Sequence, residues 1–326
     1  MSLAAFDLPV PSSYTPHALH ADDRAWAETN CYVDVWIELL HALRLNPVAC
    51  MGMALANDFD GDQWTFYKPP HEDLFELYGL DVHELNVWKS ILTNASEQLK
   101  RGRVVLSEID SFYLPDTAGT DYRRNHVKTT IAIQSLDLEK QQLRYFHNRS
   151  YHQLQGDDFV NLFRVGFPSD PGFMPFFAEF VRLDRMQRLE DAELASIALQ
   201  LLKKHFVRRP SQNPVLAYRQ RFLDDIEALK LTGIDAYHAY AFSHLRQLGS
   251  GAELLASQMA WLDAEGLGDF SVAAGDMLSL SNATKTLLMK AARAVVIKRP
   301  ADLGAMIDEI AEHWQSAMEN LSRELN

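Results

Sequence analysis

The sequence predicts an α+β domain followed by an all-helical domain, from three observations along its 326 residues. A cysteine, Cys31, stands at the start of a segment with apolar residues at helical spacing. In the middle of the chain, residues 127–134 read VKTTIAIQ, a β-branched run typical of a strand. From about Arg182 onward nearly every segment has helical periodicity. We therefore expect a Cys/His domain over 1–168 and a helical bundle domain over 169–326.

The elements of the first domain follow from local patterns of apolar residues and from the residues that interrupt them. Asn46-Pro47 and Gly102 each follow a helical pattern and are expected to end it. A polar turn separates the central strand from a second apolar run, which predicts an antiparallel pair. The expected elements are helices over 31–45, 71–78 and 83–100 and strands over 63–67, 104–113, 127–134 and 143–146.

The second domain is expected to contain only helices, joined by short breaks. No fixed-period repeat is visible, which argues against a solenoid. A Pro- and Gly-containing linker is expected near 167–172. The expected helices cover 184–206, 214–231, 234–248, 251–265, 270–296 and 301–324, with breaks at 209–210, 249–251, 266 and 299–300.

The overall charge and cysteine content exclude several classes of protein. The net charge of −13 gives no electrostatic support to nucleic-acid binding or to a basic membrane-surface helix. Two cysteines cannot form a disulfide framework, so a reducing compartment is expected. No signal peptide or membrane-spanning stretch is visible. We expect a cytoplasmic protein with no metal site, since zinc spacing is absent and the acidic stretch 58–62 lacks the calcium-loop pattern.

Cys31 is the first candidate for chemistry because it stands at the N-terminus of the expected helix. Unpaired N–H groups and the helix dipole favour a thiolate over a thiol at that place. Thr29 and Asn30 are good N-cap residues directly before it. The alternative is that Cys31 is a small buried side chain. The second cysteine, Cys50, is expected to be packed rather than reactive.

A thiol nucleophile needs a base and a group that orients the base. His126 is the expected base because it precedes the central strand directly after a long polar loop, although it could be a solvated loop residue. Asn148, or less naturally His147, follows the next strand and could orient the imidazole; ordinary turn chemistry is the alternative for Asn148. The order Cys, His, Asn on a helix and two strand ends is that of papain-like enzymes.

Two stretches carry a resemblance to a known family. Residues 104–115, VVLSEIDSFYLP, followed by His126, resemble a strand–loop–His signature of the acyltransferase family of butirosin biosynthesis. Residues 28–31, ETNC, are similar to its Glu-Thr-His-Cys pattern. The chain also resembles a bacterial family of uncharacterised proteins with Thr-Asn-Cys-Tyr-Val-Asp and Tyr-Phe-His-Asn segments. The motifs cover roughly 26–165.

The resemblance implies a papain-like fold and an acyltransferase. In the butirosin-type enzyme an acyl group moves from the phosphopantetheine thioester of a carrier protein, through a cysteine, to an amine. The implied partners are an acyl or aminoacyl carrier protein and a small amine, with no cofactor bound by the chain itself. That family usually has an Asp as third triad member, whereas the matching stretch here reads His147-Asn148.

Five further residues are expected to line the substrate site. The Cys31 N–H would hold the oxyanion, but the papain-type glutamine position is Ala25, so another donor is needed. Glu28 and Asn30 are nearest, and Glu28 could instead pair with a basic group or cap the helix. Asp110 is expected to hold the loop with Arg123 and Arg124 or to meet an amine. The expected substrate-contacting residues are Glu28, Asn30, Asp110, Tyr113 and Arg124.

Two other functions remain open on this sequence. A papain-like peptidase or amidase would differ only in that water, rather than an amine, resolves the acyl-enzyme. A degenerate papain-like fold could instead serve as a binding scaffold without catalysis. Hydrolysis of simple peptides would favour the peptidase, and an unusually acidic Cys31 thiol would argue against the scaffold.

Overall fold

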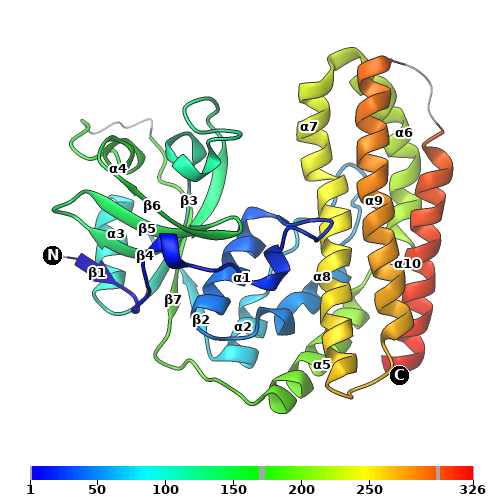
Figure 1. The fold of residues 1–326 in the computed structure, drawn as a ribbon, viewed down its shortest axis with the longest axis horizontal. Helices are drawn as coiled ribbons and strands as arrows, with labels where there is room; N and C mark the ends of the chain where they lie inside the picture. The colour runs from blue at the N-terminus through cyan, green and yellow to red at the C-terminus, as the bar shows by residue number, and fades with distance from the viewer. Residues whose placement is uncertain (1, 169–172, 299–301, 326) are drawn as a thin grey trace. The chain divides into compact units, whose positions relative to one another are not determined.

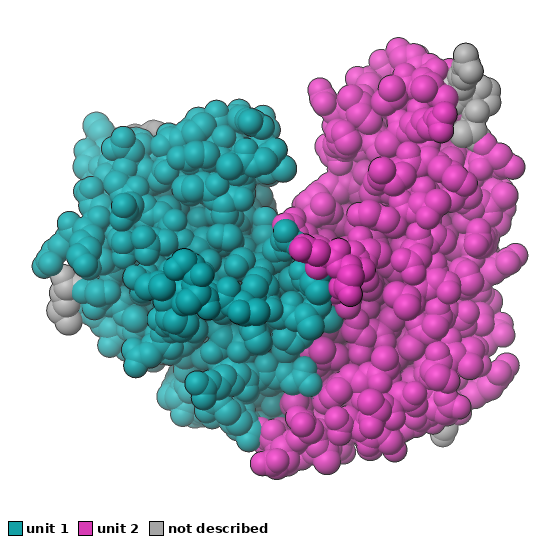
Figure 2. All heavy atoms as spheres, in the orientation of Figure 1, with its two compact units in different colours: residues 1–21, 30–47, 74–188 teal, residues 22–29, 48–73, 189–326 magenta. Residues whose placement is uncertain are grey.

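The computed structural model of the protein describes residues 2–168, 173–298 and 302–325. The chain forms two compact units, one built on a β-sheet and one helical (Figure 2). The expected α+β class and the helical C-terminal region are confirmed. The sheet unit contains residues 1–21, 30–47 and 74–188, and the helical unit contains residues 22–29, 48–73 and 189–326.

A seven-stranded sheet organises the first unit, and all of its neighbouring strands run antiparallel (Figure 1). The strand order is β2-β7-β3-β4-β5-β6, and β1 pairs with the far end of β4. The strands are β1 (Ser2–Ala4), β2 (Asp81–Glu84), β3 (Val104–Asp110), β4 (Lys128–Asp137), β5 (Gln142–His147), β6 (Ser150–Gln155) and β7 (Ala178–Arg182).

The two faces of this sheet are covered differently. Helix α1 (Cys31–Ala42) packs on β4 and β5, whereas α3 (Ile91–Leu99) packs on β3 and β4. The α3 face forms an apolar core that includes Ile131, Ile133 and Tyr145 together with α4 (Asp157–Leu162). Since successive strand residues point to opposite faces, Thr130 and Ala132 point toward the α1 face. Short 3-10 turns complete the unit: η1 (Pro11–Ser13), η2 (Ala18–His20), η4 (Ser111–Tyr113) and η5 (Pro115–Thr117).

The expected helix over 83–100 is wrong in its first half. Residues Asp81–Glu84 form β2, whose Val82 pairs with Val181 of β7. The helix begins only at Ile91, after Ser90, whose side chain accepts a hydrogen bond from the Thr93 N–H. The apolar spacing continued upstream of this cap, but pairing with a strand distant in sequence determines the local structure there.

A buried cluster fastens the N-terminal segment onto α1. Nδ1 of His20 lies 2.5 Å from a Glu38 oxygen, and Nε2 lies 3.3 Å from Asp34. The Tyr14 hydroxyl donates to the second Glu38 oxygen at 2.5 Å. Burial alone would lower the pKa of His20, but the hydrogen bonds and charges of Asp34 and Glu38 outweigh it and raise the pKa to about 9. A protonated His20 thus compensates two buried carboxylates.

The helical unit consists mainly of four long helices that pack in pairs, α8 on α9, α9 on α10 and α10 on α6 (Figure 1). Within the described residues, no helix combines the length and apolarity needed to cross a bilayer. The helices of this unit are η3 (Pro47–Ala56), α5 (Asp191–Arg208), α6 (Pro214–Thr232), α7 (Ile234–Ser243), α8 (Leu245–Ala264), α9 (Ser271–Ile297) and α10 (Gly304–Leu325). Helix α2 (His71–Tyr78) begins in this unit and ends in the sheet unit.

The expected helix break at 249–251 is wrong, because α8 runs through both glycines without interruption. A Cβ at Gly249 would lie 2.5 Å from the Trp26 ring, and one at Gly251 would lie 3.2 Å from the Tyr67 ring. The glycines therefore provide room for aromatic side chains rather than ending the helix. Glu253, one turn further, accepts hydrogen bonds from the Ala25 and Trp26 N–H groups.

The expected strand over 63–67 is also absent from the described structure. Trp64 makes only an isolated bridge with Phe59, and its ring packs against Phe59 and Tyr218. The Trp64 ring is buried in the helical unit rather than in a sheet.

Raising the pH should weaken the His20 cluster. Because the pKa of His20 is raised from 6.5 to about 9, its contribution is complete below pH 6.5 and disappears as the pH rises through 9. We expect the difference in unfolding free energy between wild type and His20→Gln to shrink by up to about 3 kcal/mol from pH 6 to pH 10. Urea unfolding at both pH values measures it; a difference independent of pH would contradict the assignment.

A methyl group at Gly249 should destabilise the helical unit. Gly249→Ala forces the Trp26 ring to move and is expected to cost about 1–3 kcal/mol of unfolding free energy. Gly275→Ala is the matched control, because that glycine is exposed on α9 and has open space around it. The control should gain about 0.5–1 kcal/mol. Equal effects of the two substitutions in urea unfolding would refute this packing role.

Candidate functional site

Cys31 is the first residue of α1, as the sequence predicts. Asn30 is the N-cap, with extended backbone, and its side chain accepts a hydrogen bond from the Val33 N–H at 3.0 Å. The Cys31 thiol is partly exposed and donates to the Thr130 hydroxyl of β4 at 3.8 Å. Among the described residues, no hydrogen bond uses the Cys31 N–H. A thiol and an unused N–H donor therefore occur together at the helix N-terminus.

His126 forms a pair with Asp110, the last residue of β3. Nδ1 of the imidazole lies 2.6 Å from one Asp110 oxygen, and the other oxygen accepts the Phe112 N–H at 3.0 Å. The Phe112 ring stacks on the imidazole with centroids 4.3 Å apart and planes 7° from parallel. Asp110 and Phe112 thus fix the ring, while the His126 side chain stays 65% exposed. Nε2 is left as the nitrogen that can exchange protons with a ligand.

Strand register relates this pair to Cys31. Thr130 and Lys128 are two residues apart on β4 and share a face, and Asp110 is the cross-strand partner of Lys128. Cys31 and the His126–Asp110 pair therefore lie toward the same face of the sheet. Lys128, bonded to Glu108 at 2.6 Å, comes between them. Within the described residues, the Cys31 thiol forms its hydrogen bond with Thr130 and His126 forms its own with Asp110. No hydrogen bond joins Cys31 to His126.

His147 is directed to the opposite face. Its Nε2 lies 2.8 Å from the hydroxyl of Thr129, the strand neighbour of Thr130, and Nδ1 lies 2.5 Å from Asp116. Because adjacent strand residues point to opposite faces, the structure does not bring His147 to Cys31. Asn148 lies in the turn after β5 with φ of 47°. Neither residue bonds to His126 in the described part of the chain.

The His147 cluster is a buried polar network. The Tyr145 hydroxyl donates to Asp116, whose other oxygen binds His147. Burial works to raise the pKa of Asp116, but the hydrogen bond and charge of His147 outweigh it and hold the pKa below its usual value. Burial lowers the pKa of nearby His152. This network ties the loop after β3 to the end of β5, and that loop leads into His126.

The other expected substrate-contacting residues have mixed surroundings. Glu28 belongs to the helical unit, where its carboxylate lies 4.0 Å from the Arg246 guanidinium of α8. The Tyr113 ring lies 6.3 Å from the His126 ring, between centroids. Arg124, two residues before His126 in the sequence, is exposed. Its neighbour Arg123 is bonded to Asp158.

Three features of the site were missed from the sequence. Thr130 contacts the thiol, Phe112 stacks on the imidazole, and Asp110 binds His126 rather than the loop arginines. The antiparallel register of β3 and β4 could have indicated the last contact, since it brings residues just before β4 beside the end of β3. The stacking and the thiol contact depend on side-chain packing that leaves no pattern in the sequence.

No described group of three or more His, Cys, Asp or Glu side chains could hold a metal ion. The site as it stands offers a thiol, an oriented imidazole, an unused backbone N–H and several carboxylates. Such groups suit nucleophilic attack on a carbonyl carbon followed by proton transfer.

Comparison with known families finds two matches that together cover most of the chain. Residues 15–183 match the family model described as the DUF1839 N-terminal domain. Residues 191–323 match the DUF1839 C-terminal domain. No curated protein matches the sequence.

Two substitutions separate a turn role of Asn148 from a catalytic one. Glycine adopts a φ of 47° without strain, so Asn148→Gly should leave the unfolding free energy within about 0.5 kcal/mol of wild type. Asn148→Ala should cost about 1–2 kcal/mol. Both remove the amide, so a catalytic amide predicts equal losses of Cys31-dependent activity. We expect activity to survive in the glycine variant; its loss there would restore the catalytic role.

Proposed function

The chain belongs to the DUF1839 family, and we propose that it transfers acyl groups through Cys31. The donor in this proposal is an acyl or aminoacyl thioester on a carrier protein, and the acceptor is a small amine. The sheet unit would be a papain-like domain related to the butirosin-type acyltransferases that its motifs resemble. A free thiol nucleophile fits a reducing cytoplasm.

One observation carries the proposal: an imidazole oriented by a carboxylate faces the same side of the sheet as a thiol at a helix N-terminus. Asp110 binds Nδ1 of His126 at 2.6 Å, which leaves Nε2 to accept or deliver a proton. We therefore assign the orienting role to Asp110 in place of Asn148. In hydrolytic and acyl-transfer triads the carboxylate performs this function by fixing the tautomer of the histidine.

The enzyme starts with Cys31 as a thiolate and with the thiol proton on His126. In the proposed first step, the Cys31 sulfur attacks the thioester carbonyl carbon. The carbonyl oxygen takes the negative charge and receives a hydrogen bond from the Cys31 N–H, which has no other partner among the described residues. The carbon–sulfur bond to the pantetheine arm then breaks. The departing thiolate takes the proton that His126 holds, so an acyl-enzyme and a free carrier thiol result.

In the second step, an amine attacks the acyl-enzyme. Nε2 of His126 accepts the proton that the amine loses, the bond to the Cys31 sulfur breaks, and the sulfur leaves as a thiolate. The product is an amide, and the enzyme returns to its starting state. Because Lys128 lies between Thr130 and His126 on this face of the sheet, His126 is better placed to exchange protons with the carrier thiol and the amine than to form a hydrogen bond with the resting Cys31 sulfur.

Intact-mass spectrometry after mixing with an aminoacyl carrier protein tests this function. We expect wild type, and Cys50→Ala as matched control, to gain the mass of the acyl group when no amine is present. Cys31→Ala should gain none. His126→Gln should slow amine-dependent release about 10²- to 10⁴-fold, and Asp110→Asn at least about tenfold.

The outcomes separate the alternatives. Release of free acid at the same rate with and without amine would make the protein a hydrolase. Acylation of Cys31→Ala equal to that of wild type would contradict a role for this thiol. Binding of the carrier protein without any acylation would indicate a scaffold and would also contradict the proposal.

A further inference from the structure

A pocket of about 600 Å³ lies at the opposite end of α1 from Cys31, within the sheet unit. Its volume falls in the range of small-molecule sites. Four segments of chain converge on it: the stretch after β1, the end of α1, the turn before β3 and the stretch after β7. Its wall is apolar apart from three charged side chains, Asp7, Arg44 and Arg188.

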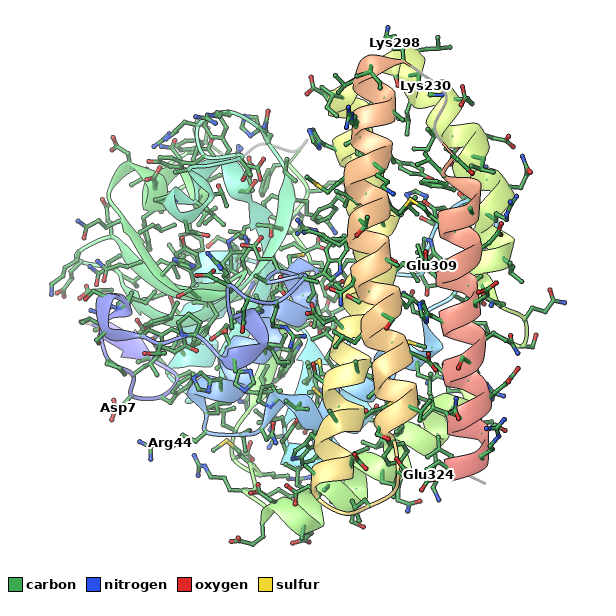
Figure 3. The ribbon with its side chains drawn as sticks, turned by 45° about the vertical axis from the view of Figure 1, so that its right-hand side comes forward. Asp7, Arg44, Lys230, Lys298, Glu309 and Glu324 are labelled. Carbon is green, nitrogen blue, oxygen red and sulfur yellow. The ribbon has the colours of Figure 1, made fainter. Side chains whose placement is uncertain are left out.

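The three charged side chains that line this pocket are exposed to solvent. Among the described residues, none of its three charged side chains forms an ion pair, although the chain contains 44 acidic residues. Arg188 donates one hydrogen bond, to the Leu43 carbonyl at 3.2 Å. Figure 3 shows the side chains of Asp7 and Arg44 projecting outward from this unit. The lining therefore carries a net positive charge in an acidic protein.

Arg44 has a backbone conformation that arginine rarely adopts. Arg44 has φ of 59° and follows the C-cap of α1, a position where glycine is favoured because it has no Cβ. Its N–H bonds the His41 carbonyl, and the Leu45 N–H bonds the Leu40 carbonyl. An arginine in the left-handed region costs about 1 kcal/mol or more, so a use for its guanidinium would explain its presence.

Capping of the helix end does not require the Arg44 guanidinium. The negative end of a helix arises from carbonyl groups without partners. Most of the carbonyls at the C-terminal end of α1 accept backbone N–H groups or Arg188, and no hydrogen bond in the described structure joins the Arg44 guanidinium to any of them. The carbonyls that accept hydrogen bonds are those of Leu39, Leu40, His41 and Leu43.

We propose that this pocket binds an organic anion, a carboxylate or phosphate carried on an apolar body. The forks of Arg44 and Arg188 match the geometry of such oxyanions. Phe6, Leu183 and Met186 would cover the apolar body of the ligand. This site is separate from Cys31: twelve residues of α1 span about 18 Å. It therefore does not depend on the proposed acyl transfer.

Isothermal titration with phenyl phosphate and phenylacetate as probes tests the site, with inorganic phosphate and benzyl alcohol for comparison. Wild type should bind at least one of the two aromatic anions at millimolar concentration or below. Inorganic phosphate and benzyl alcohol should each bind at least about tenfold more weakly. Arg188→Gln should weaken anion binding about tenfold or more.

Arg44→Gly distinguishes binding from structural support. Glycine relieves the backbone at φ of 59°, so the variant should keep or raise its Tm while anion binding falls about tenfold or more. Arg185→Gln is the matched control, an exposed arginine on the same segment outside the lining, and should bind as wild type does. Absence of binding of both aromatic anions, or equal affinity in Arg44→Gly and wild type, would overturn the proposal.

Discussion

The packing of α1 against β4 and β5 is the contact on which the arrangement of the candidate site depends. One helix carries the Cys31 thiol at its first residue, the carboxylates that bind the N-terminal segment in its middle, and the arginine of the anion pocket just past its end. Its central residues are almost completely buried, and it packs on β4 and β5. Within the described residues, the Cys31–Thr130 contact and the His126–Asp110 pair share this face of the sheet, and no hydrogen bond joins them.

Alternation along β4 then determines which groups can act together. Thr130 contacts the Cys31 thiol and Thr129 contacts His147, so two adjacent residues of β4 place the thiol and His147 on opposite faces of the sheet. The His126 imidazole is exposed and stacked on the Phe112 ring, and its Nε2 can reach a ligand. The His147 imidazole is buried and saturated with hydrogen bonds, as in a structural network. Their separation favours His126 over His147 as the chemical base.

The elements that depend on local interactions could be predicted from the sequence. The helix that starts at Cys31, its Asn30 cap, the strand after His126 and the helical second half all followed from spacing and capping. The predictions failed where contacts between distant segments determine the local structure. Val82 forms a strand because it pairs with β7, and Gly249 lies inside a helix where the absence of a Cβ makes room for the Trp26 ring. For the same reason Asp110 was not recognised as the partner of His126, because that contact requires the register of two strands joined by a long loop.

The segment that leads into α1 belongs to the helical unit, where Glu253 binds the N–H groups of Ala25 and Trp26.

The most direct test of a site shared by Cys31 and His126 asks whether His126 influences the Cys31 thiol in solution. Iodoacetamide alkylation of Cys31, followed by intact mass from pH 5 to 9, measures this, with buried Cys50 as internal reference. We expect the pH dependence of the alkylation rate to change in the variant His126→Gln. Superimposable profiles would contradict a shared site.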